Sequence, residues 1–152
     1  MRQILIKIFF KMLVFLELLI SFIDIYFNNM NIKSSKELVD EANESIKVMS
    51  PEQVKNAYEK GEVTLIDVRD IRELWKEGTI KDSIHIPRGM LEFWLDPQSS
   101  YYQEKKIGNI KNIVLFCALG FRSALAGESI QKMGYKNVYS MSGGYSDWIN
   151  NN

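Results

Sequence analysis

Short apolar runs alternate with segments of helical periodicity over most of the chain that follows Ile32. Runs of this kind are typical of parallel strands that helices cover on both sides. Pro87 stops the second run, and the third run is apolar on both of its faces. Strands are therefore predicted at residues 63–68, 83–86, 113–116 and 137–141.

Residues that start and stop helices flank the segments of helical spacing. Ser50, Pro51 and Gln53 form a start signal, in which the serine caps the helix and the glutamine completes a capping box. Gly61 is suited to end that helix in a left-handed conformation. Helices are therefore predicted from Ser34 or Ser35 to about Ile46, from Ser50 to Gly61, from Ser123 to Met133 and from Tyr145 to Ile149, with a further helix starting at Arg88.

The order of these elements predicts the fold class. Strands and helices alternate along the chain, which is typical of an α/β protein with an open, mostly parallel sheet. The domain is expected to span residues 32–150, and residues 96–106 are its most loop-like stretch. No internal repeat and no low-complexity tract is found in the sequence.

The segment before this domain, residues 1–29, has a different pattern. From Ile4 to Phe27 nearly every residue is apolar, and the run lacks the charge-free length of about 18 residues that a spanning helix needs. Placed on a helical wheel, its polar residues share one arc, which predicts an amphipathic helix with a very wide apolar face. These polar residues are Gln3, Lys7, Lys11, Glu17, Ser21 and Asp24.

Three interpretations of residues 1–29 stay open. The helix can lie in a membrane interface through residues 4–27. It can be a signal anchor, although no small-residue cleavage site is evident. It can also be an upstream extension that the natural product lacks, because Met30 would open an ordinary soluble domain. The expected location is cytoplasmic, with membrane association through this helix as the open alternative.

Composition excludes several function classes. The chain carries 19 Lys and Arg residues and 19 Asp and Glu residues, so it has no excess of positive charge for nucleic acid. It has one cysteine and one histidine, which excludes an internal disulfide and a cysteine-rich metal site. No metal and no cofactor is therefore expected, and Cys117 is either an inert core residue or a reactive centre.

The chemistry is predicted in the loop between the strand at 113–116 and the helix that follows it. Ligands of open α/β sheets collect at the carboxyl ends of strands, and Cys117 lies at such an end. If the loop curls around its cysteine, its amide groups and the following helix dipole form an anion cradle that favours a thiolate. The candidate residues are Cys117, Ala118, Leu119, Gly120, Phe121, Arg122 and Ser123.

Three of these residues have particular expected roles. Gly120 supplies the backbone freedom of a tight turn. Arg122 offers a planar cation that can hold an oxyanion in two contacts. Ser123 can cap the helix or donate to the sulfur of Cys117. The alternative is a cysteine that packs as a small apolar residue, which is common for a lone cysteine on a strand.

Four stretches of the chain resemble the rhodanese family, and together they run from about Lys36 to Ile149. The family's single-domain members carry a Cys-x-x-Gly-x-Arg-Ser loop, which matches residues 117–123. Residues 65–69 resemble the family's Asp-Val-Arg strand end, residues 78–87 its Gly-His-Ile to Ile-Pro segment, and residues 143–148 its closing Gly-Gly-x-x-x-Trp. Thr79 stands where the family usually has histidine, and Asp82 and Ser83 replace a common Gly-Ala pair.

The resemblance implies an enzyme, a thiosulfate sulfurtransferase-like protein, with a three-layer domain of about five central strands and helices on both faces. It implies transfer of sulfane sulfur through a persulfide on Cys117, from a small donor such as thiosulfate or a persulfide to an external thiol or protein acceptor. Asp67 and Arg69 are expected to support the site from behind rather than to meet the substrate. The apolar residues Ala118, Leu119 and Phe121 suggest a larger persulfide carrier as the donor.

Two alternatives belong to other functional classes. One is a non-catalytic binding or persulfide-carrier module, which an intact cysteine does not exclude. The other is a related family of phosphatases and arsenate reductases, which uses a similar cradle with five residues between its cysteine and its arginine. Here four residues separate Cys117 from Arg122, and the smaller ring should not hold a tetrahedral phosphate.

Overall fold

The computed structural model describes residues 2–29, 32–108, 110 and 112–151. The contacts divide the chain into two units, of which the first contains α1 (Arg2–Asn29) and the second begins at Ser35. α1 is a single uninterrupted helix, and its described side chains are exposed. Within the described residues, no helix has the length and the apolar character needed to cross a membrane.

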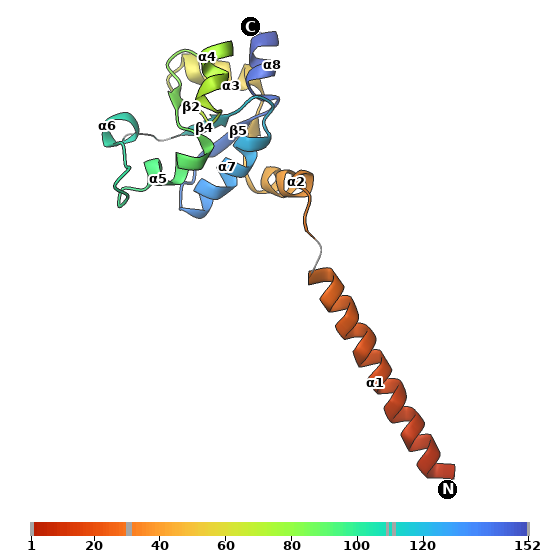
Figure 1. The fold of residues 1–152 in the computed structure, drawn as a ribbon. Helices are drawn as coiled ribbons and strands as arrows, with labels where there is room; N and C mark the ends of the chain where they lie inside the picture. The colour runs from red at the N-terminus through yellow and green to blue at the C-terminus, as the bar shows by residue number, and fades with distance from the viewer. Residues whose placement is uncertain (1, 30–31, 109, 111, 152) are drawn as a thin grey trace. The chain divides into compact units, whose positions relative to one another are not determined.

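The second unit is built on a fully parallel sheet of five strands (Figure 1). The strands lie in the order β1-β5-β4-β2-β3, so β4 is central and has β5 and β2 as its neighbours. Their bounds are β1 (Lys47–Met49), β2 (Thr64–Asp67), β3 (Ile84–His85), β4 (Ile113–Phe116) and β5 (Val138–Met141). The α/β class and the parallel sheet predicted from the sequence are confirmed.

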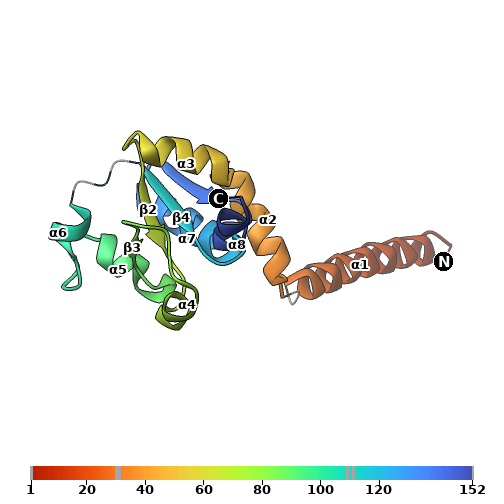
Figure 2. The same ribbon diagram turned by 90° about the horizontal axis from the view of Figure 1, so that it is seen from above.

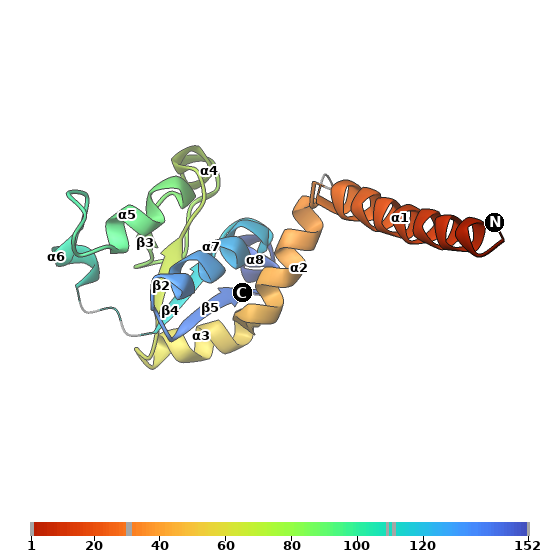
Figure 3. The same cartoon turned by 90° about the horizontal axis from the view of Figure 1, so that it is seen from below.

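Helices cover both faces of this sheet, and they make a three-layer domain (Figures 2 and 3). One face packs against α5 (Leu91–Leu95) and α7 (Phe121–Lys132), and α2 (Ser35–Ser45) lies outside α7 and packs on it. The other face packs against α3 (Pro51–Glu59) and α8 (Gly144–Asn150). The remaining helical segments are α4 (Ile71–Glu77), η1 (Arg88–Met90) and α6 (Glu104–Ile107).

Alternation along β4 assigns each of its side chains to one of two cores. Ile113 and Leu115 are buried in the core that faces α7, and Val114 and Phe116 in the core that faces α3 and α8. The pleat of a strand turns successive side chains to opposite faces. Cys117, next in this alternation, therefore belongs to the α7 side, where it is part of the same buried cluster.

Most predicted element boundaries differ from the structure by one or two residues. The predicted capping box at Ser50 and Gln53 is confirmed, because each side chain accepts the other's backbone N–H. Gly61 has the expected left-handed conformation, although the helix itself ends at Glu59. The second unit begins near the predicted boundary at residue 32.

Several elements were not predicted correctly. The helix expected to reach Ile46 ends at Ser45, and a strand follows at once as β1. That strand forms because it pairs with β5, a long-range contact that three residues of local sequence do not signal. The helix α4 was not predicted, and α6 forms at the end of the stretch that looked most like a loop.

Candidate active site

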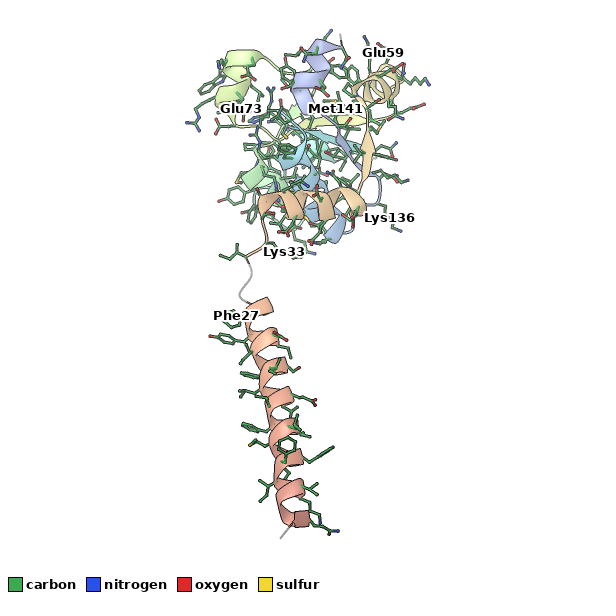
Figure 4. The ribbon with its side chains drawn as sticks, turned by 90° about the vertical axis from the view of Figure 1, so that its right-hand side faces the viewer. Phe27, Lys33, Glu59, Glu73, Lys136 and Met141 are labelled. Atoms are coloured by element: carbon green, nitrogen blue, oxygen red, sulfur yellow. The ribbon has the colours of Figure 1, made fainter. Side chains whose placement is uncertain are left out.

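Cys117 follows the last residue of the central strand, at the carboxyl end of the sheet. Figure 4 labels Glu73, which belongs to α4, and Met141, the last residue of β5. Residues 117–120 form a tight turn that leads into α7. The structure therefore places the predicted loop at the edge of the sheet where α/β proteins bind their ligands.

The backbone of the turn is oriented by the start of α8. The N–H of Tyr145 donates to the carbonyl of Cys117 at 2.7 Å, and the N–H of Ser146 donates to the carbonyl of Ala118 at 3.1 Å. These two carbonyls are thereby turned toward α8. On the side of the sulfur, the N–H of Gly120 donates to Sγ of Cys117 at 3.2 Å. One amide of the predicted cradle thus faces the sulfur.

Two glycines allow this close approach of backbone to backbone. A Cβ atom on Gly144 would lie 2.3 Å from the carbonyl oxygen of Cys117 and 2.6 Å from that of Ala118. Gly144 and Gly120 both have a positive φ, of +59° and +93°, which side chains disfavour. The sequence pointed to Gly120 but treated Gly144 only as part of a family pattern.

Ser123 lies under the sulfur and does not cap the helix. Gly120 is the N-cap of α7, and the hydroxyl of Ser123 is hydrogen bonded to the Gly120 carbonyl at 2.9 Å and to Ser140 Oγ at 2.9 Å. The same hydroxyl lies 3.8 Å from Sγ of Cys117, so its single proton can go either to the Gly120 carbonyl or to the sulfur. Of the two predicted roles for Ser123, the cap is wrong, because the helix begins two residues earlier, at Phe121.

The sulfur of Cys117 is enclosed. The residue is 1% exposed, a degree of burial that is common for a cysteine at the end of a strand. The side chain belongs to the buried cluster on the α7 side, and its sulfur faces the N–H of Gly120.

Arg122 extends from the loop to the carboxylate of Glu73, a residue that was not among the candidates predicted from the sequence. Its Nη1 donates to Glu73 Oε1 at 2.6 Å, and its Nη2 donates to Glu73 Oε2 at 2.8 Å. These hydrogen bonds raise the pKa of Arg122, and the nearby Cys117 sulfur raises it further, whereas partial burial opposes the rise. The arginine fork, expected to be free for an oxyanion, is thus occupied by an internal anion.

Glu73 is held in place by its own helix. Asp70 is the N-cap of α4, and Glu73 completes a capping box because its Oε1 also accepts the Asp70 N–H at 3.0 Å. The pKa of Glu73 is lowered, chiefly by the hydrogen bonds from Arg122, so its side chain is ionised at neutral pH. The Asp-x-x-Glu spacing of a capping box is the sequence signal that would have revealed both α4 and this residue.

Asp67 and Arg69 form a fully buried ion pair behind the site. Arg69 Nη2 lies 2.8 Å from Asp67 Oδ2 and also donates to the carbonyl of Gly78 at 2.7 Å. Its guanidinium stacks over the ring of Tyr145 at 4.1 Å, and Thr79 donates to Asp67 Oδ2. No hydrogen bond from this pair to the sulfur is found among the described residues, and Tyr145, whose N–H donates to the Cys117 carbonyl, links the pair to the loop.

The outer rim of the loop is apolar. Leu119 and Phe121 are 55% and 58% exposed, and Ala118 is half-buried. A groove of about 570 Å³ runs beside Arg122 between α2 and α7, with Val39, Phe121 and Leu125 among the residues that line it. In the described ranges, no group of three His, Cys, Asp or Glu side chains is arranged to hold a metal ion.

Comparison with known proteins supports this architecture. Residues 50–151 match the model of the family described as Rhodanese-like domain. A protein of Schizosaccharomyces pombe named "Putative thiosulfate sulfurtransferase, mitochondrial" is 34% identical over 88 residues, which cover 55% of this chain and 61% of that protein. The chain thus spans about three fifths of the length of this curated relative.

Two solved structures resemble the second unit. A protein of Rhodopseudomonas palustris, described as of unknown function and a possible tyrosine phosphatase, is 38% identical with a TM-score of 0.75 and covers 80% of this chain and 93% of its own. The homodimeric polysulfide-sulfur transferase of Wolinella succinogenes is 32% identical with a TM-score of 0.60, covering 76% and 82%. With its parallel sheet, its cysteine loop and these matches, the chain belongs to the rhodanese-like domain family.

Proposed function

We propose that this protein is a sulfurtransferase that carries sulfane sulfur as a persulfide on Cys117. The family and the names of its relatives support sulfur transfer in general. The observation that carries the finer proposal is the Gly120 N–H, which donates to the sulfur at 3.2 Å, with the Ser123 hydroxyl also in reach of the sulfur at 3.8 Å. Donors aimed at a sulfur stabilise a thiolate and, after transfer, a persulfide anion.

The reaction proceeds in two balanced steps. The Cys117 thiolate forms a bond to the outer sulfur of the donor, and the bond between the donor's two sulfurs breaks. The donor remainder leaves with the electron pair, as sulfite from thiosulfate or as a thiol, once protonated, from a persulfide. An external thiolate then attacks the outer sulfur of the Cys117 persulfide, and Cys117 is released as a thiolate. No second cysteine exists in the chain to take the sulfur internally.

The test is intact-mass measurement after incubation with a donor panel that includes thiosulfate and an organic persulfide. The wild-type protein should gain the mass of one sulfur atom, and Cys117→Ser should gain none because it lacks the attacking sulfur. Addition of a small thiol should then remove the added mass. A wild type that stays unmodified with every donor, or a Cys117→Ser variant that is modified equally, would rule the proposal out.

The number of turnovers distinguishes a sulfurtransferase enzyme from a persulfide carrier. A carrier is the second function that the site supports. The apolar groove beside Arg122 offers a surface on which a partner protein or the organic part of a large persulfide can pack. Many turnovers with a small donor and a small thiol indicate an enzyme. Stoichiometric loading that small thiols do not reverse, but a partner protein does, indicates a carrier.

Phosphatase activity, named as a possibility for the Rhodopseudomonas protein, is not proposed for this chain. Four residues separate Cys117 from Arg122, one fewer than the phosphatase loop requires. The arginine that would bind the phosphate is already hydrogen bonded to Glu73 at both terminal nitrogens. The carboxylate of Glu73 neutralises the charge of Arg122, which weakens the attraction of this loop for a phosphoryl group.

For α1 we propose attachment to a membrane surface, with its apolar side chains in the interface and its polar arc toward the headgroups. The full chain should therefore sediment with liposomes, whereas a chain that begins at Met30 should stay in the supernatant. The measurement is the bound fraction of each chain at increasing lipid concentration. Equal sedimentation of the two chains would contradict a membrane role for this helix.

A further inference from the structure

We propose that Glu73 is a built-in competitor for the anion-binding fork of Arg122, and that it selects persulfide donors over small dianions such as thiosulfate. This inference rests on the proposed function, because it names the donor class of the same cysteine. The starting observation is that both terminal nitrogens of Arg122 already donate to the Glu73 carboxylate, at 2.6 Å and 2.8 Å. Glu73 thus takes two of the five N–H groups of the guanidinium and neutralises its charge, so an anionic donor at Arg122 meets a competing carboxylate.

The carboxylate is not easily displaced. Its Oε1 also accepts the Asp70 N–H at 3.0 Å, so the start of α4 holds Glu73 in position. The pair is also partly shielded from water, with side chains 41% exposed at Arg122 and 27% exposed at Glu73. A bidentate pair of this kind is stronger than an ordinary surface ion pair.

The charges around Cys117 disfavour the binding of a dianionic donor. Arg122 is the only charged residue of the loop, and Glu73 neutralises it. Two other cations nearby are also paired, Arg69 with Asp67 in the buried network and Lys36 of the groove with Asp40. A Cys117 thiolate therefore adds a net negative charge, and thiosulfate would bring two more into an enclosed site of low dielectric constant.

A persulfide donor avoids this penalty. When the Cys117 thiolate attacks the outer sulfur of a protonated persulfide, the reacting groups carry one negative charge in total, before and after transfer. The proton of the donor ends on the leaving thiol, so no dianion forms. The exposed Leu119 and Phe121 and the groove along α2 and α7 offer apolar surface for the organic part of such a donor.

The test compares two donors in single-turnover loading of Cys117, measured by intact mass. The donors are thiosulfate and a persulfide whose organic part is uncharged, such as that of N-acetylcysteine methyl ester. In Glu73→Gln, the second-order rate constant for thiosulfate should rise about tenfold, because removal of one charge close to a dianion changes its binding by that order. The rate constant for the persulfide should change by less than about threefold, since little net charge enters the site.

Three controls isolate the charge of Glu73. Glutamine keeps the capping box, since it serves as the box partner in α3 of this chain, so Glu73→Gln should fold as the wild type does. Glu77→Gln makes the same charge change at the end of α4, where the carboxylate contacts Arg69 and Lys76 but not Arg122, and it should leave the donor ratio unchanged. Alkylation of Cys117 by iodoacetamide, a neutral reagent, reports how accessible the sulfur is.

Each outcome decides between distinct explanations. If Glu73→Gln raises the loading rate constant for thiosulfate but not that for the persulfide, and does not speed alkylation of Cys117, the result supports competition by the Glu73 carboxylate. If the rate constants for thiosulfate, the persulfide and iodoacetamide all rise by the same factor, the substitution has only made the sulfur of Cys117 more accessible. That result overturns the inference. Loss of loading with both donors would show that Glu73 is needed to position Arg122, which also overturns it. Failure of the wild type to load from any donor would instead refute the proposed function.

Discussion

Replacing Arg69 with methionine should lower the free energy of unfolding by about 3–5 kcal/mol, because it leaves the buried Asp67 carboxylate without its cation. Both side chains are 0% exposed, and Arg69 supplies two side-chain nitrogens to the carboxylate. The substitution also removes the hydrogen bond to the Gly78 carbonyl and the stacking on Tyr145. Urea unfolding followed by circular dichroism measures the change.

The matched control is Arg72→Met, which removes an arginine three residues away. Arg72 pairs with Asp70 at the surface, where solvent screens the attraction, so the control should stay close to wild-type stability. Adding Asp67→Asn to Arg69→Met should recover part of the loss, because it removes the unpaired charge. If Arg69→Met and Arg72→Met unfold at the same urea concentration, the buried pair contributes no more to stability than the surface pair does.

Replacing Gly144 with alanine should lower the free energy of unfolding by at least about 3 kcal/mol and abolish sulfur loading at Cys117. The new methyl group would lie 2.3 Å from the Cys117 carbonyl oxygen, and φ is +59° at this position, which costs a further penalty for any side chain. Relief of the clash must push α8 away from the turn. The hydrogen bonds from Tyr145 and Ser146 that orient the turn would then be lost.

Gly89→Ala is the control for this second prediction. Gly89 lies in η1, and a Cβ atom there would meet no other atom within 4 Å. This variant should therefore keep both its stability and its sulfur loading, measured by urea unfolding and intact mass. Full loading in Gly144→Ala would mean that the contact between α8 and the turn is not required for the reaction.

The local sequence was sufficient for the elements whose signals are local. The apolar run at Ile113–Phe116 predicted the central strand correctly, because a strand buried on both faces admits few polar residues. The capping box at Ser50 and the left-handed Gly61 were also predicted, since both depend on contacts between neighbours in the chain. The strand β1 was missed because its only support is pairing with β5, far along the sequence.

The candidate site shows the same difference between features with local signals and features that depend on long-range contacts. The sequence placed Cys117, Gly120 and Ser123 in one strand–turn–helix unit, and the structure brings the three together. It could not indicate that Arg122 would pair with Glu73, because the two residues lie 49 positions apart and meet only through the sheet. The burial of the sulfur depends in the same way on packing from several elements.

By itself, the sequence determined the fold class, the family resemblance and the position of the cysteine at the end of a central strand. These features follow from hydrophobic periodicity and turn chemistry, which act over a few residues. Only the tertiary structure decided that the sulfur is enclosed, that Gly144 must lack a side chain and that Arg122 is occupied by Glu73. The physical reason is that burial and ion pairing depend on which surfaces meet when the helices pack on the sheet.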